Sequence, residues 1–241
     1  MAAVPPAPTP TTAIPATVVV PALQGAVDRY CKSLTTCERL LKLHPRSKGH
    51  PSNAAALAPA IVLSTTAAFE GFAEDFSAIA LAKSGLSFGE IAKKIGNWHN
   101  PHLMEFRNYM RDSFPAAASQ LKAGVPIPIF TFTSSRGAAK PATLTWDQAL
   151  TASRAWMQVR HHLTHGLTTG WRSERWYGPL KGTEPNAHEV LRPMGKGLYS
   201  LTIHGAITCA RIYSIGAEAI SNAVSAHLGE TLDWSSRPEF N

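Results

Sequence analysis

The sequence predicts an all-α fold, an antiparallel helical bundle with a small β-hairpin or loop insertion around residues 125–146. Three observations support this prediction. Apolar residues recur at spacings of three and four over long stretches, helix-start patterns precede several of them, and one segment switches to strand-like alternation. A chain of 241 residues can also bury one sizeable core.

The helical domain is expected over residues 22–228, between two tails. Residues 1–21 carry no charge and hold six of the 18 prolines, so they are expected to be a disordered tail. A frayed C-terminal tail is expected over residues 229–241, after the helix-stopping Gly229.

Six helices are predicted from apolar spacing together with start and stop signals. In chain order they span residues 23–43, 59–83, 87–98, 100–114, 145–166 and 198–228. The pairs Ser87/Glu90 and Thr145/Gln148 match capping boxes, in which each side chain bonds the other residue's backbone N–H. Residues 171–197 are rich in glycine and proline and are expected to be irregular.

Two segments depart from this simple helical pattern. Ile127, Ile129, Thr131 and Thr133 alternate with other residues before a Ser-Ser-Arg-Gly turn, which favours a hairpin. The most apolar stretch, residues 53–69, contains a proline and runs straight into Glu70. We interpret it as a buried helix rather than a membrane span.

Composition narrows the function classes. A net charge of +7 and a pI near 9.5 favour an anionic partner. The three cysteines form no CxxC pair and are expected to be reduced packing residues. Walker, GxGxxG and GxSxG patterns are absent, which argues against nucleotide hydrolysis and α/β-hydrolase chemistry. Without a basic start before an apolar stretch, no secretory signal is expected, and a cytoplasmic location is predicted.

The segment from Gln158 to Gly166 concentrates one arginine and three histidines at a predicted helix end. Helical spacing places Trp156, Val159 and Leu163 on one apolar face, bordered by Arg160, with His161 and His165 on a second side. A guanidinium suits a phosphate, and an imidazole exchanges protons near neutral pH. The alternative is that these cationic groups cap the free carbonyls of the last helical turn.

The run Arg160-His161-His162-Leu163-Thr164-His165-Gly166 resembles the Arg-polar-x3-His motif of the HEPN superfamily, near its bacterial RiboL-PSP-type and stand-alone members. Residues 68–76 are similar to the family's acidic-aromatic helix, and residues 100–103 and 108–114 to the segment between. The resemblance implies a metal-independent endoribonuclease that acts as a homodimer on RNA, without a cofactor. It also implies two long antiparallel helices.

The resemblance carries expected roles for three residues. Arg160 would hold the scissile phosphate, His165 would serve as general base or acid, and His161 would position the phosphate or supply a second proton-transfer group. His161 occupies a position where the family commonly has Asn or Asp and where His also occurs. A toxin or antiviral defence effector with an antitoxin or regulatory partner would fit the family, whereas a catalytically inactive helical interaction or nucleic-acid-binding module is the alternative.

Further candidates flank the motif in the sequence. Glu70 and Glu74 form either a solvated acidic face or a supporting pair in which Glu70 fixes Arg160. Three later residues mix charge with aromatic surface and could bind RNA or pack a loop: Arg172, Arg175 and Trp176. The His161/His165 spacing is typical of a zinc helix, but no nearby third ligand stands out, so no metal is expected.

Overall fold

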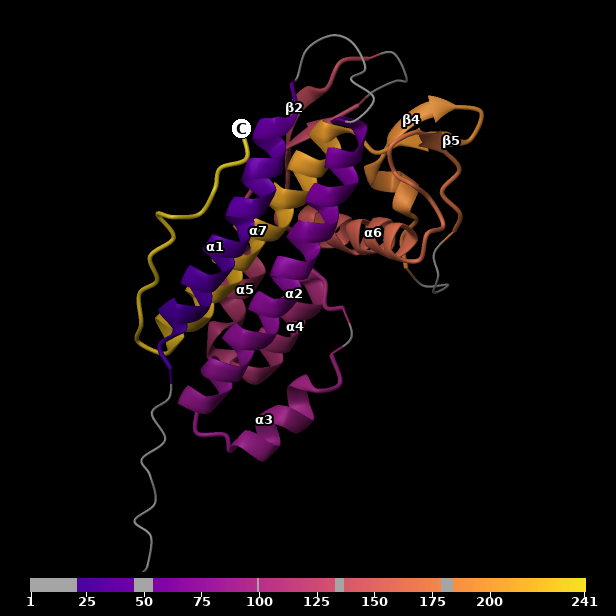
Figure 1. Cartoon of the computed structure of the whole chain (residues 1–241). Coiled ribbons are helices and arrows are strands. Elements are labelled where there is room, and N and C mark those ends of the chain that lie inside the picture. The colour runs from indigo at the N-terminus through magenta and orange to yellow at the C-terminus, as the bar shows by residue number, and fades with distance from the viewer. Residues whose placement is uncertain (1–20, 46–53, 99, 133–136, 179–183) are drawn as a thin grey trace, which may run out of the picture.

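Helices dominate the computed structural model, which describes residues 21–45, 54–98, 100–132, 137–178 and 184–241. The predicted helical character is confirmed for these residues. The three longest helices, α1 (Leu23–Leu43), α2 (Leu57–Lys83) and α7 (Ile203–His227), lie side by side, and α6 (Trp146–Thr164) runs across α2 and α7 (Figure 1). Shorter helices follow α2 or precede α6: α3 (Phe88–Ile95), α4 (Leu103–Ser113) and α5 (Ala118–Ala123). Apart from Pro21, the predicted N-terminal tail lies outside the described residues.

The core is organised around the phenylalanine stripe of α2. Phe72 stacks on Tyr30 of α1 with 4.5 Å between ring centroids. Phe69 contacts Tyr213 of α7 at 4.8 Å and Phe106 of α4 at 5.9 Å. All five rings are buried, so this one stripe joins four helices.

The helix that contains this stripe is also the most apolar one. Residues 54–83, which include a short 3-10 turn (Ala54–Ala56) before α2, are long and apolar enough to cross a membrane by length and composition alone. Core helices of soluble proteins pass the same test. The buried phenylalanines of α2 agree with the prediction of a core helix.

Helix starts follow the predicted capping signals at two places. Ser87 and Glu90 form a complete capping box before α3, and Thr145 and Gln148 form another before α6. The start predicted near Asn100 is two residues too early, because α4 begins after His102. The Nδ1 atom of His102 accepts the Glu105 N–H at 3.2 Å and thus acts as the cap.

The predicted hairpin is confirmed. Strands β1 (Ile127–Thr131) and β2 (Lys140–Leu144) pair antiparallel, with Ile129 opposite Ala142. The hairpin is tied to α7, because the N–H of Phe130 donates to Thr208 Oγ1 at 2.9 Å. Thr133, the last residue of the predicted alternation, lies outside the described residues.

The expectation that residues 171–197 are irregular is wrong in part. Strands β3 (Ser173–Glu174), β4 (Arg192–Gly195) and β5 (Leu198–Ser200) form a small antiparallel sheet in the order β3-β5-β4. Gly195, Lys196 and Gly197 all have positive φ and make the tight turn between β4 and β5. Because residues 198–200 pair in this sheet, α7 starts at Ile203 and not at Leu198.

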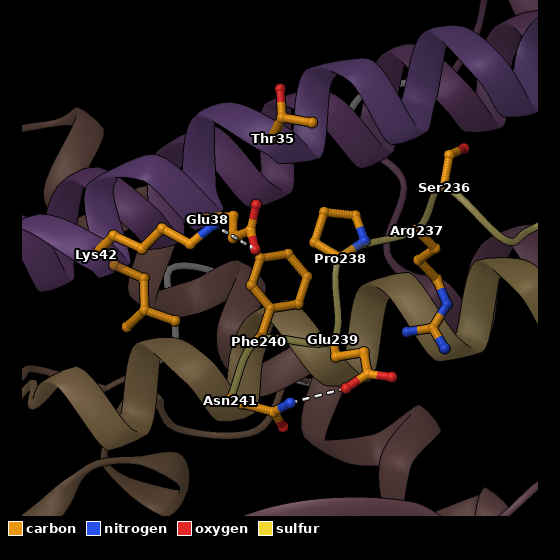
Figure 2. Close-up of a pocket in the computed structure, with 10 residues that line it drawn as sticks. Thr35, Glu38, Lys42, Ser236, Arg237, Pro238, Glu239, Phe240 and Asn241 are labelled. Carbon is orange, nitrogen blue, oxygen red and sulfur yellow. Dashed lines mark hydrogen bonds and ion pairs between the residues drawn. The ribbon is translucent and has the colours of Figure 1, made fainter.

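The C-terminal segment is packed and not frayed, which corrects the second tail prediction. Residues 229–241 run back along α1 and α7, and Figure 2 shows Pro238 and Phe240 between these two helices. Trp234 and Phe240 are 8% and 2% exposed. Arg237 pairs with Glu218 of α7 at 2.8 Å. Ordering a chain end costs conformational entropy, and burial of two aromatic rings supplies enough free energy here to offset that cost. A short polar tail buries too little apolar surface to do so.

We expect His102 to make the protein acid-sensitive. Burial lowers the pKa of His102 from 6.5 to about 4, against a raising effect of Glu184 and with a lowering effect of Arg154. The unfolded chain takes up this proton near pH 6.5, so the stability contribution is complete above that pH and is lost as pH falls toward 4. Between pH 7 and pH 5 the free energy of unfolding should fall by about 2 kcal/mol from this group.

Urea unfolding at both pH values measures this loss, with His102→Ser as the comparison. Serine keeps a capping oxygen but does not titrate. An equal loss in wild type and variant would contradict the assignment to His102.

Candidate functional site

The C-terminal end of α6 closes on itself at Gly166, close to the predicted helix end. Gly166 adopts a left-handed conformation with φ of 65°, which suits glycine. The N–H of Leu167 donates to the His162 carbonyl at 2.9 Å, and the N–H of Gly166 donates to the Leu163 carbonyl at 3.3 Å. These two bonds form a Schellman motif, which ends the helix after Thr164.

The preceding carbonyls of the last turn also have partners that are not imidazoles. Thr164 Oγ1 donates to the Arg160 carbonyl at 3.0 Å, and the N–H of His165 donates to the His161 carbonyl at 3.0 Å. The sequence left open whether cationic side chains cap these groups. Because backbone N–H groups and a hydroxyl do so, the ring of His165 is not needed as a cap.

Arg160 forms an ion pair with Glu70, the partner considered for it from the sequence. Arg160 Nη2 lies 3.3 Å from Glu70 Oε2, and the two side chains are only 19% and 17% exposed. The pair joins α6 to the middle of α2, one residue from the buried Phe69. It restricts the rotamers of Arg160 before any ligand binds, which lowers the entropic penalty of binding one.

The Glu70 carboxylate is incompletely satisfied by this pair. Burial raises the pKa of Glu70, Arg160 lowers it, and the charge of Glu74 raises it. Glu70 Oε1 is buried and has no hydrogen-bond partner among the described residues. Glu74 itself is exposed one helical turn further along α2. Thus Glu70 holds Arg160 directly, whereas Glu74 acts on the pair only through its charge.

The three histidines of the motif fall into two environments. The rings of His161 and His165 are nearly parallel, with an interplanar angle of 24° and 6.2 Å between centroids, and His165 is exposed. His162 is fully buried, and its Nδ1 lies 2.7 Å from the Gln158 carbonyl. A carbonyl oxygen can only accept, so the His162 proton is assigned to Nδ1. His165 is therefore exposed and His161 is half-buried, whereas His162 belongs to the core.

The segment after the motif separates the three predicted RNA-binding residues. Arg172 and Arg175 are exposed, and the guanidinium of Arg172 lies 4.4 Å above the ring of Trp171. Trp176 is only 5% exposed and packs against the ring of His162 at 5.6 Å. Its position corresponds to the packing alternative, and Trp171 is the more accessible indole.

Sequence reasoning missed the residue that holds this segment in place. The carboxylate of Glu174 accepts the backbone N–H groups of Thr169 and Gly170, at 2.9 and 3.3 Å. Gly170 has a φ of 72° and lies against Leu163, where a Cβ would overlap the leucine side chain. Two glycines, Gly166 and Gly170, indicate turns in this segment of the sequence. They do not identify Glu174 as the acceptor, because a carboxylate can accept from many groups.

The spacing of His161 and His165 is typical of a zinc helix, which would need a third ligand close by. Among the described ranges, no group of three or more His, Cys, Asp and Glu side chains is arranged to hold a metal ion. The three cysteines, Cys31, Cys37 and Cys209, are free and buried, as predicted for packing residues.

The chain matches no protein-family model, no curated protein and no solved structure. The resemblance to the HEPN superfamily therefore rests on the motif and its flanking segments alone.

Burial predicts opposite roles for the two tryptophans next to the motif. Trp176→Ala should lower the free energy of unfolding by about 3–5 kcal/mol, since it opens a cavity beside His162. Trp171→Ala should change it by less than about 1 kcal/mol, because Trp171 is 41% exposed. Urea denaturation of both variants measures this difference, and comparable losses would contradict the packing role of Trp176.

Proposed function

We propose that the protein is a metal-independent endoribonuclease that acts as a homodimer. The observation that carries this proposal is the self-capped end of α6, where His165 is exposed and Arg160, five positions earlier, is held by Glu70. The resemblance to HEPN ribonucleases, in which these positions are the catalytic ones, supports the same assignment. A role as a toxin or antiviral defence effector in the cytoplasm, with an antitoxin or regulatory partner, is part of this proposal.

The reaction is a transphosphorylation by the ribose 2′-hydroxyl. His165 removes the proton of this hydroxyl, and the 2′-oxygen attacks the phosphorus while the bond to the 5′-oxygen breaks. The leaving oxygen takes a proton from a second imidazole, either His161 or His165 of the second subunit. Arg160 stabilises the negative charge that develops on the phosphate oxygens. The products are a 2′,3′-cyclic phosphate and a 5′-hydroxyl.

A dimer would supply positive charge that a single chain lacks at the phosphate. Within one chain, Glu70 already offsets much of the charge of Arg160, since the two groups are 3.3 Å apart. A two-fold axis through the α6 ends would place two arginines and two sets of imidazoles around one phosphate. The proposal includes an antiparallel helical bundle, the arrangement that the family resemblance implies, with the end of α6 at the dimer interface.

The same ion pair favours a second candidate function. An arginine neutralised by a partly buried carboxylate is also what a catalytically inactive interaction or nucleic-acid-binding module would contain. Such a module would bind RNA or a protein partner through its basic surface without cutting RNA. The two functions differ in whether RNA is cleaved.

Purified protein treated with a chelator should cleave single-stranded RNA. Arg160→Ala and His165→Ala should each lower the cleavage rate by at least about 100-fold, because each removes a group that acts in the transition state. Gel analysis of labelled RNA measures the rate, and phosphatase treatment with end-labelling identifies the cyclic phosphate and 5′-hydroxyl ends.

His227→Ala is the matched control, since His227 is an exposed histidine in the last turn of another long helix. It should cleave like wild type, and circular dichroism should show equal helical content in all variants. Equal cleavage by all three variants would contradict the assignment and indicate a contaminating nuclease, whereas no cleavage by wild type would favour the binding module.

Glu70→Gln tests whether the ion pair positions Arg160. The glutamine keeps an acceptor oxygen but loses the charge that orients the guanidinium, so cleavage should fall by roughly ten- to 100-fold. Because the raised pKa means that ionised Glu70 is disfavoured in the folded state, stability should also decline less in the variant as pH rises above 4.5.

Asp75→Asn provides the control for this test. Asp75 lies on the same helix and pairs with Arg29 at 2.6 Å, so the variant also breaks a carboxylate–arginine pair. Its cleavage rate should match wild type. Unchanged cleavage in Glu70→Gln would remove Glu70 from the site.

A further inference from the structure

A cavity of about 670 Å³ lies between the β3-β5-β4 sheet and the adjoining ends of α1, α2 and α7. These elements meet at one end of the molecule (Figure 1). Its described lining has three groups that can carry positive charge, His44, Arg172 and Arg192, and no aspartate or glutamate. The indole of Trp171 also lines the cavity and is 41% exposed. The lining therefore combines cationic groups with an accessible π surface.

Both arginines of the cavity are stacked on aromatic rings. Arg172 lies 4.4 Å above Trp171, and Arg192 lies 5.2 Å above Phe132 and donates to the Gly137 carbonyl at 3.1 Å. Stacking occupies the face of a guanidinium, and its N–H groups point outward in the plane of the fork. Among the described residues, Arg172 has no carboxylate partner. Its donors thus suit an oxyanion such as a phosphate.

The only carboxylate in the strand that follows Arg172 is engaged elsewhere. Glu174 accepts the N–H groups of Thr169 and Gly170, so its charge serves the loop that joins α6 to β3. The N-terminus of α7, with the N-cap Thr202 and the first residue Ile203, also lines the cavity and adds partial positive charge to that of the arginines. The local charge balance is therefore strongly in favour of an anion.

The cavity adjoins the end of α6 through Gly170. Leu163 of α6 and Leu201 of the cavity lining both approach Gly170, where a Cβ would lie 2.7 and 3.4 Å from their methyl groups. The cavity lining and the end of α6 are therefore neighbours. Five residues lie between Gly166 and Arg172.

We propose that this cavity binds one nucleotide unit of a single-stranded RNA, with the base on Trp171 and a phosphate at Arg172 and Arg192. This inference deepens the proposed ribonuclease function and rests on it for the identity of the ligand. A planar base stacks on an indole regardless of sequence, and the arginine forks bind the adjoining phosphate. The cavity would hold the substrate strand beside the α6 end and so set which phosphate reaches it.

Binding is measured by fluorescence anisotropy with a labelled twelve-nucleotide adenylate strand in which every 2′-hydroxyl is methylated. Methylation prevents cleavage by 2′-oxygen attack, so binding is recorded whether or not the protein is a nuclease. Trp171→Ala and Arg172→Gln should each weaken binding about tenfold. Arg111→Gln removes the same charge from an exposed position on α4 and should stay within about twofold of wild type.

Thermal melting confirms that the variants fold, which is expected because both cavity side chains are exposed. Affinities within twofold of wild type for Trp171→Ala and Arg172→Gln would overturn the inference. If wild type nevertheless cleaves RNA in an Arg160-dependent manner, only the cavity assignment fails. Loss of binding in these variants without any cleavage by wild type would retain the cavity and refute the nuclease.

A free nucleotide carries the same base and phosphate groups as one unit of an RNA strand and is the other ligand that could occupy the cavity. Calorimetric titration with adenosine 5′-monophosphate distinguishes the two sources. Binding of the monophosphate only at millimolar concentration supports an RNA strand as the ligand. Micromolar binding that Arg172→Gln abolishes, without binding of the twelve-nucleotide strand, would overturn the RNA assignment in favour of a free nucleotide.

Discussion

Burial of the phenylalanine stripe of α2 is the constraint on which the arrangement of the other helices depends. Phe72 meets α1 and the C-terminal segment, and Phe69 meets α4 and α7. Glu70 follows Phe69 directly and extends toward Arg160 of α6. The same turn of α2 therefore fixes both the core and the position of the arginine, so a shift of α2 would move the candidate site as well.

This coupling places a carboxylate where it is partly stripped of water. Burial disfavours the ionised form of Glu70 and Arg160 favours it, so the attraction within the pair is offset by the loss of hydration. Such a pair contributes little to stability. It does restrict the guanidinium to one orientation, which is the property that recognition of a phosphate requires. The α6 end is stabilised separately, by backbone bonds at Gly166, and His165 is exposed there.

Features decided by neighbouring residues were predictable from the sequence. The capping boxes at Ser87 and Thr145 and the helix end near Gly166 involve residues three to five positions apart, and each is present. The hairpin and the core stripe of α2 follow from simple periodicity. Glu70 and Arg160 are 90 positions apart, and the sequence allowed either a pair between them or a solvated acidic face. Only their opposite charges on two predicted helices favoured the pair. The second sheet escaped notice because its strands have two to four residues each, too short to show alternation.

The sequence by itself determined where most helices begin and end and which face of α2 is buried, because backbone capping and apolar spacing act within one or two turns. Only the tertiary structure decided that Trp176 is a core residue and Trp171 an exposed one, and that the chain after Gly229 packs between α1 and α7. It also decided that Arg172 and Arg192 share a cavity. The physical reason is that burial and charge proximity depend on surfaces contributed by distant segments, and no local pattern records which surfaces will meet.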